Sequence, residues 1–368
     1  MDADRLLRAR TAAVDAGLDA LLVTPGPDLR YLTGYDAIPL ERLTCLVLRS
    51  GGEPALVVPA LERPAAEASP AGSLGMEIVD WNETDDPVEL VAKMLPSARR
   101  VGVDDHMWAE KVLRFRTAMP DTQQVLAGPI LHELRMRKRP DEVEALREAG
   151  AAIDRVHARV GEWLRSGRTE RAIGRDVADA IIAEGHARVD FVIVASGPNS
   201  ASPHHENGDR VIVPGDPVVV DIGGTTDRGY CSDETRTYVV GTPSDAFVEA
   251  YGVLRRAQAA GVEQVRPGVS AESVDAAARD VLAQAGLGEY FVHRTGHGIG
   301  LETHEEPYIV AGNARVLEPG MVFSVEPGFY MPKRYGARIE DIVVTTDDGV
   351  ERLNLRPHEL AILDPDPG

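Results

Sequence analysis

Acidic side chains in the second half of this chain follow runs of residues that are typical of buried β-strands. Asp221 comes after VVV, Glu326 after MVFSV, and Glu340 after ARI. Because an ionised carboxylate is costly to remove from water unless it is paired, hydrogen-bonded or bound to a cation, one such residue would indicate a structural salt bridge as readily as a binding site. Three of them, together with Asp233 in the next strand-like run and the glycine-flanked His297, favour a cation-binding site.

These five side chains, four carboxylates and one imidazole, form an oxygen-rich ligand set. Such a set suits Mn²⁺, Co²⁺, Fe²⁺ or Zn²⁺ rather than a structural zinc held by thiolates. Arg236 and Arg338 could pair with two of the acids but could not neutralise all four. Two divalent ions bridged by carboxylates, about 3.5–4 Å apart, would balance the charge and hold a shared water or hydroxide. The expected reaction is metal-assisted hydrolysis.

Charge and composition exclude several other classes of protein. The chain carries 39 Lys and Arg against 59 Asp and Glu, a net charge of −20, which argues against binding to nucleic acid or to an anionic membrane. Its two cysteines, Cys45 and Cys231, lie far apart and predict neither a disulfide framework nor a zinc knuckle. We find no export signal and no apolar stretch long enough to cross a bilayer, so a cytoplasmic protein is expected.

The length of 368 residues exceeds the usual size of one hydrophobic core and predicts two domains. In the first third, helix-like and strand-like segments alternate, which predicts a small α/β domain. A basic run with two prolines at 128–140 ends this pattern, so we expect domains at 1–130 and 131–368. The expected elements of the first domain are an opening helix, strands at 20–24, 43–49, 55–59 and 101–105, and a helix near 87–95.

The second domain is predicted to be α+β. Pro140 followed by two acids suits the first turn of a long helix. Runs rich in β-branched residues at 218–224 and 235–241 predict a hairpin. The other expected elements are helices at 140–164, 169–184, 244–265 and 270–285, and strands at 191–195, 321–325 and 338–345.

Four spaced motifs resemble those of the metal-dependent Xaa-Pro peptidases, which include prolidases and Xaa-Pro aminopeptidases. The motifs are DIGGTTDRGYCSDETRT, HRTGHGIGLETHEEP, VFSVEPGFY and ARIEDIV, and LRYLTGY near the N-terminus is similar to the creatinase-type domain that precedes the catalytic domain in these enzymes. The resemblance implies an α+β pita-bread catalytic domain behind a smaller α/β domain. It also implies two divalent metal ions, with Mn²⁺ favoured over Co²⁺, Zn²⁺ or Fe²⁺.

The resemblance assigns a metal-binding role to each of the five candidate ligands. It implies that Asp221 binds one metal and that Asp233 and Glu340 bridge the two. His297 and Glu326 would complete the shell of one ion, and Glu326 would also accept the proton of the bridging water.

Three histidines and one arginine resemble residues of the same family that bind substrate or transfer protons. These are His204, His293 and His304, with Arg338 steadying the carboxylates. His204 lies 221 − 204 = 17 positions before Asp221, whereas His205 would point to the other side of an extended chain and is expected at the surface. A histidine also suits the chemistry, because the secondary amine that leaves an X-Pro bond must be protonated as it departs.

Two details depart from the family pattern. Asp221 and Asp233 are 233 − 221 = 12 positions apart, one more than the commonest spacing, and the extra residue is expected in the hairpin loop. Tyr308 stands where some dipeptidases have an arginine for the terminal carboxylate of the substrate, so an arginine from another position or from a partner subunit would have to replace it.

The function expected from the resemblance is that of an Xaa-Pro dipeptidase acting on small proline-containing peptides. The nearest alternative is an Xaa-Pro aminopeptidase that trims longer peptides, and a more distant one is a metal-dependent lyase on the same scaffold. The resemblance also implies a homodimer in which the N-terminal domain overhangs the active site of the partner.

Overall fold

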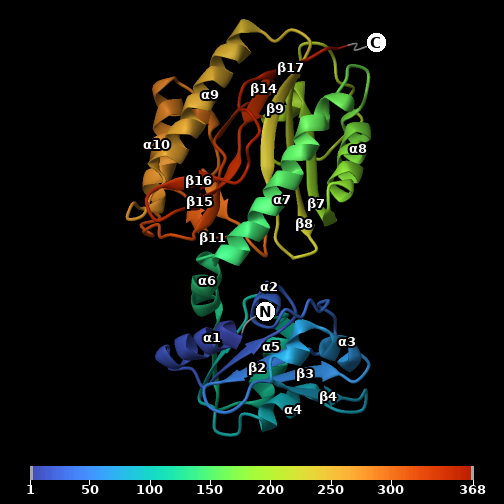
Figure 1. Cartoon of the computed structure of the whole chain (residues 1–368), viewed down its shortest axis with the longest axis vertical. Coiled ribbons are helices and arrows are strands. Elements are labelled where there is room, and N and C mark those ends of the chain that lie inside the picture. The colour runs from blue at the N-terminus through green and yellow to red at the C-terminus, as the bar shows by residue number, and fades with distance from the viewer. Residues whose placement is uncertain (1–2, 366–368) are drawn as a thin grey trace. The chain divides into compact units, whose positions relative to one another are not determined.

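The computed structural model describes residues 3–365, which form two compact units (Figure 1). The chain passes from one unit to the other between Arg135 and Met136, against an expected boundary after residue 130. Helix α6 (Gly128–Met136), which has proline as its second residue, ends at this point. Helix α7 (Pro140–Arg159) begins with a proline shortly after it.

The first unit contains a six-stranded mixed sheet with helices on both faces. Its strand order is β4-β3-β2-β1-β5-β6, in which β1 is antiparallel to β2 and parallel to β5. The bounds are β1 Ala20–Val23, β2 Cys45–Arg49, β3 Ala55–Pro59, β4 Glu77–Trp81, β5 Arg100–Val103 and β6 Gln123–Leu126, with helices α1 Ala3–Asp15, α2 Pro27–Thr33, α3 Arg63–Ala68, α4 Pro87–Lys93 and α5 Ala109–Ala118.

Strands β1, β2 and β3 are apolar, apart from Arg49 at the end of β2, because both of their faces are covered. Leu22, Val47 and Val57 pack with Val91 of α4 and Phe115 of α5. The alternate side chains point to the other face, where α1 and α3 lie against the strands. This arrangement explains why the sequence shows continuous hydrophobic runs here rather than an alternation of apolar and polar residues.

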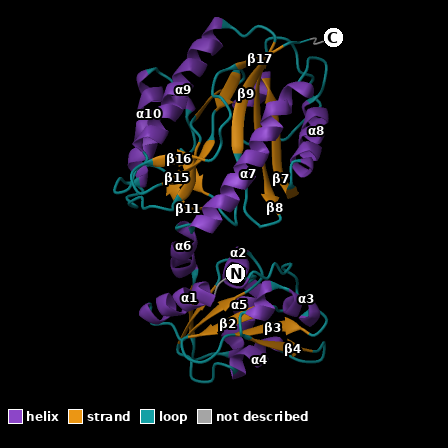
Figure 2. Ribbon diagram, viewed as in Figure 1, coloured by secondary structure: helices purple, strands orange, loops and turns teal. Residues whose placement is uncertain are grey.

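The second unit is built from three sheets and four long helices (Figure 2). Its sheets have the orders β17-β9-β8-β7, β11-β10-β12-β15-β16 and β13-β14. The helices are α7, α8 Glu170–Ala183, α9 Asp245–Gln264 and α10 Ala271–Gln284, and the strands are β7 His186–Ser196, β8 Pro217–Thr226, β9 Glu234–Val240, β10 Gly296–Gly298, β11 Glu305–Ile309, β12 Val322–Val325, β13 Gly328–Met331, β14 Tyr335–Arg338, β15 Asp341–Thr345, β16 Val350–Arg352 and β17 Ala361–Leu363. Short 3₁₀ turns occur at 70–73, 160–162, 197–201 and 288–290.

Strand β8 separates a hydrophobic face from a polar one. Val218, Val220 and Ile222 pack into a core that includes Ile153 of α7 and Val177 of α8. Since successive side chains of a strand point to opposite faces, the residue between Val220 and Ile222 points away from this core. That residue is Asp221, which is therefore directed towards the remaining sheets.

The expected strand at 338–345 is confirmed for Asp341–Thr345, which form β15, but its start is wrong because the chain changes sheets there. Strand β14 ends at Arg338, which pairs with Gly328, and β15 begins at Asp341, which pairs with Val325. Between them, the backbone N–H of Glu340 donates to the carbonyl of Thr235 in β9. The acid consequently lies at the point where the three sheets meet.

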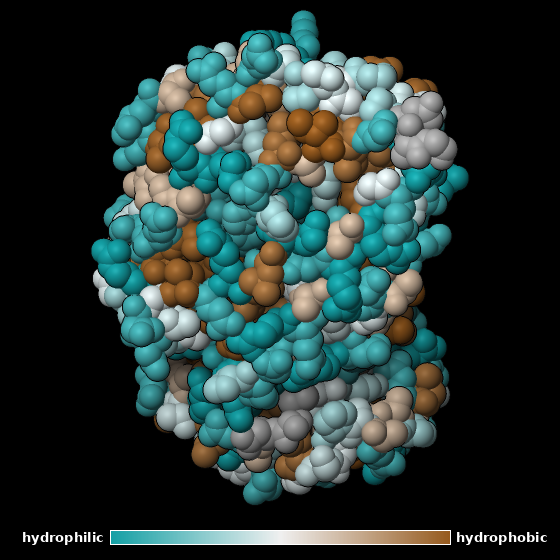
Figure 3. All heavy atoms as spheres, turned by 45° about the horizontal axis from the view of Figure 1, so that its top comes forward, coloured by the Kyte–Doolittle hydropathy of each residue, from teal (hydrophilic) through white to brown (hydrophobic). Residues whose placement is uncertain are grey.

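On the face shown in Figure 3, hydrophilic side chains surround smaller hydrophobic patches. No helix among residues 3–365 is long and apolar enough to cross a membrane.

The two isoleucines Ile153 and Ile182 provide a matched test of the α7–α8 core. Ile153 is fully buried, whereas Ile182 is 47% exposed. We expect Ile153→Ala to lower the free energy of unfolding by about 2–5 kcal/mol, because it leaves a cavity. Ile182→Ala should change it by no more than about 0.5 kcal/mol. Urea unfolding followed by circular dichroism measures both, and equal effects would contradict this packing.

Candidate metal centre

The β8–β9 hairpin positions the first two candidate ligands. Asp221 lies on β8 opposite Thr235, and Asp233 immediately precedes β9. Thr225 forms an isolated bridge with Cys231, and the chain between these two residues makes the loop of the hairpin. Both aspartates are buried, at 8% and 4% exposure.

The five-stranded sheet brings the other three candidates together. His297 is the central residue of β10, Glu326 follows the end of β12, and Glu340 precedes β15. Because β12 and β15 pair antiparallel with Val325 opposite Asp341, the residues just beyond that pair, Glu326 and Glu340, lie close together.

The glycines on either side of His297 allow this close approach of the strands. A Cβ atom on Gly296 would lie 1.8 Å from the carbonyl oxygen of Ser324, and one on Gly298 would lie 2.3 Å from that of Glu306. Any side chain at these positions would therefore push His297 away from the acids.

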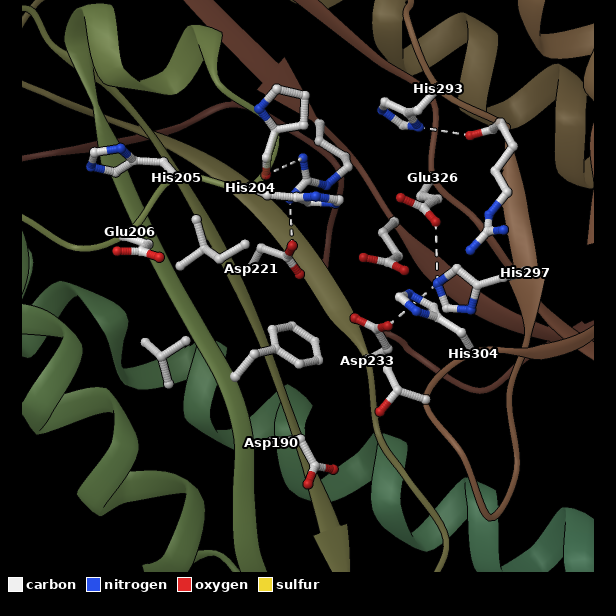
Figure 4. Close-up of a pocket in the computed structure, with 18 of the residues that line it drawn as sticks. Asp190, His204, His205, Glu206, Asp221, Asp233, His293, His297, His304 and Glu326 are labelled. Carbon is white, nitrogen blue, oxygen red and sulfur yellow. Dashed lines mark hydrogen bonds and ion pairs between the residues drawn. The ribbon is translucent and has the colours of Figure 1, made fainter. Parts of the chain in front are cut away.

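Glu326 and Asp233 lie next to His297, as Figure 4 shows. Its Nε2 lies 3.2 Å from Oε1 of Glu326 and 3.6 Å from Oδ2 of Asp233. Side-chain ligand atoms of Asp233, His297 and Glu340 all lie within 4.8 Å of one another, a spacing at which one metal ion could contact all three. The Nδ1 of His297 lies 3.1 Å from the carbonyl of Gly298, which can only accept, so Nδ1 donates to it and Nε2 faces the acids, on the side where a metal would bind.

Two buried oxygens in this cluster have no hydrogen-bond partner among the described residues. They are Oδ1 of Asp221 and Oε1 of Glu340. The second oxygen of each carboxylate is occupied, since Arg338 donates to Oδ2 of Asp221 and the Thr235 hydroxyl donates to Oε2 of Glu340 over 2.7 Å. Unpartnered buried oxygens are expected where a cation binds, so the donor set fits divalent metal ions.

Crowding of the acids disturbs their protonation. Burial raises the pKa of Asp233 well above its ordinary value, and the charges of neighbouring carboxylates, Glu340 first, raise it further. Burial and then the charge of Glu326 likewise raise the pKa of Glu340. Burial would also raise the pKa of Glu326, but the hydrogen bond and charge of His297 outweigh it and lower this pKa to about 2. Positive charge is needed before all these acids can ionise together.

The two arginines considered as partners of the acids behave differently. Arg338 donates to Asp221, as expected, and also to the hydroxyls of Thr235 and Tyr330, over 3.0 and 2.7 Å. Arg236 pairs instead with acids outside the candidate ligand set, Glu234 and Asp341, and contacts Glu340 only through the backbone carbonyl. Arg236 therefore does not neutralise a candidate ligand, because its own strand carries a competing buried acid, Glu234.

His293 and His304 lie beside the cluster as neutral side chains. Nδ1 of His293 donates to the carbonyl of Arg294 over 2.7 Å, so its Nε2 accepts from the Tyr330 hydroxyl over 2.9 Å. Burial lowers the pKa of His293. The ring of His304 meets that of His297 edge-on at 4.0 Å, and burial, followed by the charges of His297 and Arg294, lowers its pKa to about 4.

The two neighbouring histidines 204 and 205 point in opposite directions, as Figure 4 shows. His204 lies above Asp221 and is exposed within the cavity. His205, expected at the surface, is only 18% exposed and its Nε2 lies 2.8 Å from Oε2 of the fully buried Glu170. The expectation for His205 is wrong because sequence cannot show that a buried acid of α8 faces it.

A cavity of about 930 Å³ opens over the candidate ligands. One wall is formed by β7 through Phe191, Val192 and Ile193, an apolar surface next to the acids. Three residues in or beside this site were not expected from the sequence, although each lies in one of the family-like motifs: Thr235, Arg294 and Tyr330. They are recognised by their contacts with residues far away in the sequence, which no local sequence pattern can indicate.

Replacement of Gly296 by alanine tests the close approach of the strands. We expect Gly296→Ala to destabilise the protein by about 1–3 kcal/mol, since the added methyl group overlaps the Ser324 carbonyl. In the matched control Gly252→Ala, the nearest atom would lie 3.9 Å away within helix α9, so stability should rise by about 0.5–1 kcal/mol. Urea unfolding measures the free energy of unfolding of both variants. An unchanged value for Gly296→Ala would show that the strands can separate without loss of stability.

Comparison with known proteins identifies the family. Residues 144–347 match metallopeptidase family M24, and residues 5–137 match the creatinase/prolidase N-terminal domain. The probable dipeptidase PepE of Mycobacterium tuberculosis is 56% identical over 98% of this chain and 96% of its own length. The Xaa-Pro dipeptidase of Lactobacillus helveticus is 37% identical over 95% of this chain and 96% of its own length.

A solved structure agrees over nearly the whole chain. That of dipeptidase PepE from Mycobacterium ulcerans superposes with a TM-score of 0.94 at 55% identity, covering 98% of both chains. The expected fold class, a pita-bread catalytic domain behind a smaller creatinase-type domain, is confirmed. The chain belongs to metallopeptidase family M24, whose members act with divalent metal ions.

Proposed function

We propose that this protein is an Xaa-Pro dipeptidase that hydrolyses the bond before proline in small peptides. The observation that carries the proposal is the group of Asp233, His297 and Glu340, with ligand atoms within 4.8 Å of one another at the wall of a large cavity. Relatives named Xaa-Pro dipeptidase support the choice of substrate.

Five side chains are proposed to hold two divalent metal ions: Asp221, Asp233, His297, Glu326 and Glu340. Their burial, their four negative charges and the two unpartnered oxygens support this assignment. When bound, the metals would polarise the scissile carbonyl and activate the attacking water. We propose Mn²⁺ before Co²⁺, Zn²⁺ or Fe²⁺, because four carboxylates form a hard ligand set.

Residues around the proposed metals would move protons and orient the substrate. Glu326, at the wall of the cavity and 3.2 Å from Nε2 of His297, is proposed to accept the proton of the attacking water. His204 and His304 line the cavity and are proposed to contact the substrate, and a histidine there can protonate the departing proline nitrogen.

Arg338 and His293 are proposed to position the reacting groups. The guanidinium of Arg338 donates to Asp221 and to Tyr330, and the Tyr330 hydroxyl donates to His293. Arg338 thus contacts the carboxylate of Asp221 directly and the imidazole of His293 through the Tyr330 hydroxyl. Loss of Arg338 would therefore leave Asp221 less well oriented and uncompensated.

An Xaa-Pro aminopeptidase is the second candidate. The cavity of about 930 Å³ is near the upper end of the usual range for small-molecule sites and leaves room beyond two residues. We further propose a homodimer in the cytoplasm, and two buried free cysteines suit a reducing compartment.

The proposed activity is tested on metal-stripped protein to which Mn²⁺, Co²⁺ or Zn²⁺ is returned. An X-Pro dipeptide, an X-Pro-Y tripeptide and an X-Ala dipeptide serve as substrates. We expect metal-dependent cleavage of the X-Pro dipeptide in preference to the other two. Preference for the tripeptide would favour the aminopeptidase, and no cleavage of proline peptides by metal-loaded protein would overturn both.

Asp233→Asn tests the proposed ligands. Because it removes one charge from the centre of the cluster, we expect fewer than two tightly bound Mn²⁺ ions in calorimetry and a loss of at least about 100-fold in kcat/KM. The metal-free variant should be more stable than metal-free wild type, since repulsion among the acids falls. Asp209→Asn, at a side chain that is 82% exposed, is the control and should change none of these quantities.

A further inference from the structure

The imidazole of His204 borders the cavity without a partner that fixes its direction (Figure 4). Among residues 3–365, no hydrogen bond or ion pair holds this ring, and the residue is exposed. Both ring nitrogens of His293, by contrast, are hydrogen-bonded. The direction of the His204 side chain therefore depends on the backbone that carries it.

The segment between the end of β7 and residue 208 carries His204. It leaves β7 after Ser196, passes through the 3₁₀ turn at 197–201, and then alternates between exposed and half-buried residues over 202–206. Such alternation places neighbouring side chains on opposite sides of the chain, as Figure 4 shows for His204 and His205. A restraint on the side chain of His205 therefore also sets the direction of His204.

Glu170, the first residue of α8, anchors this segment. Its side chain is fully buried, and its Oε2 lies 2.8 Å from Nε2 of His205. The backbone N–H of Ser196 donates to Oε1 over 2.8 Å, that of Gly208 donates to Oε2 over 3.3 Å, and the Asn199 amide contacts both oxygens. One carboxylate thus holds the two ends of the segment and two points between them.

His205 is the donor in its contact with Glu170. Burial would raise the pKa of Glu170, but hydrogen bonds from Ser196, His205 and Asn199 outweigh it and lower this pKa. An ionised carboxylate can only accept, so Nε2 of His205 donates to it, and a hydrogen bond to a charged acceptor is stronger than one between neutral groups. Among the side chains of residues 202–206, that of His205 alone makes a hydrogen bond or ion pair.

The other side of His204 is tied to the proposed metal centre. The guanidinium of Arg338 donates to Asp221 and also to the carbonyl of Pro203, the residue before His204. The contact with Pro203 is long, at 3.5 Å, so the 2.8 Å bond of His205 is the stronger of the two restraints. His204 is therefore held between a point on a candidate ligand and a point on α8.

We propose that His205, through its hydrogen bond to the buried Glu170, positions His204 against the substrate. His205 is a positioning residue that acts through its neighbour and takes no part in proton transfer. This inference rests on the proposed function, in which His204 contacts the substrate. A displacement of about 1 Å in a group that contacts the reacting bond can lower a rate about 100-fold, so the anchor of this segment matters to activity.

A double-mutant cycle tests whether His205 acts through His204. With metal-loaded protein and an X-Pro dipeptide, we expect His205→Ala to lose about 10- to 100-fold in kcat/KM. In the His204→Ala background the same change should cost less than about threefold, because no ring is left to position. Losses that multiply in the double variant would overturn the proposal, since His205 would then act independently of His204. If His205→Ala does not fold, His205→Asn, whose amide is too short to reach Glu170, replaces it.

Three matched variants separate this role from general effects. His205→Gln keeps a donor near the position of Nε2 and should stay within about threefold of wild type in kcat/KM. His132→Ala removes a histidine of the first unit that lies 3.8 Å from Asp105 and outside the cavity, and it should match wild type. Ile153→Ala lowers stability from within the α7–α8 core and should keep kcat/KM. A loss in Ile153→Ala as large as that in His205→Ala would contradict a positioning role.

Crystal structures of the metal-loaded proteins distinguish failure of this inference from failure of the proposed function. If wild type cleaves no proline peptide, the proposed activity is wrong, but the side-chain positions can still be compared. In His205→Ala we expect the His204 ring to move or to lose its electron density, whereas in His205→Gln it should keep its wild-type position. A His204 ring in the same position in all three proteins would overturn the inference, whatever their activity.

Discussion

Mutual repulsion among buried carboxylates is the constraint around which the catalytic unit is organised. Asp233 and Glu340 are buried together, and burial with neighbouring negative charge raises the pKa of each well above its ordinary value. A fold would normally avoid this arrangement, because every ionised member destabilises the others. It is stable when cations supply the missing charge, and the unpartnered oxygens of Asp221 and Glu340 show where that charge is lacking.

The backbone achieves this crowding by bringing three sheets to one point. Strand β8 keeps its hydrophobic face against α7 and α8 and presents Asp221 on the other. The chain then changes sheets between β14 and β15, and Glu340 lies at the change. Gly296 and Gly298 lack the side chains that would hold the strands apart, so the absence of a side chain on either side of His297 is what allows it to approach the acids.

Positive charge around the cluster is divided between structural and available groups. Arg338 and Arg236 are both engaged by buried acids, so they stabilise the fold and fix the orientation of its side chains. His293 and His304 stay neutral because burial lowers the pKa of each, which keeps them able to accept or donate hydrogen bonds. Arg294 differs from all of these in retaining an unengaged charge at the cavity wall.

Sequence by itself determined the family, the two-part architecture and the types of side chain in the site, because acids after buried strands and glycines beside a histidine are local patterns. Hydrophobic periodicity also located the β8–β9 hairpin and helices α7 to α10. Only the tertiary structure decided which charges pair. Arg338 reaches Asp221 across 117 positions, Arg236 turns to Asp341 instead of a candidate ligand, and His205 meets Glu170. These partners come from different strands and helices, and the energy of a buried charge depends on what surrounds it in space, which no local pattern contains.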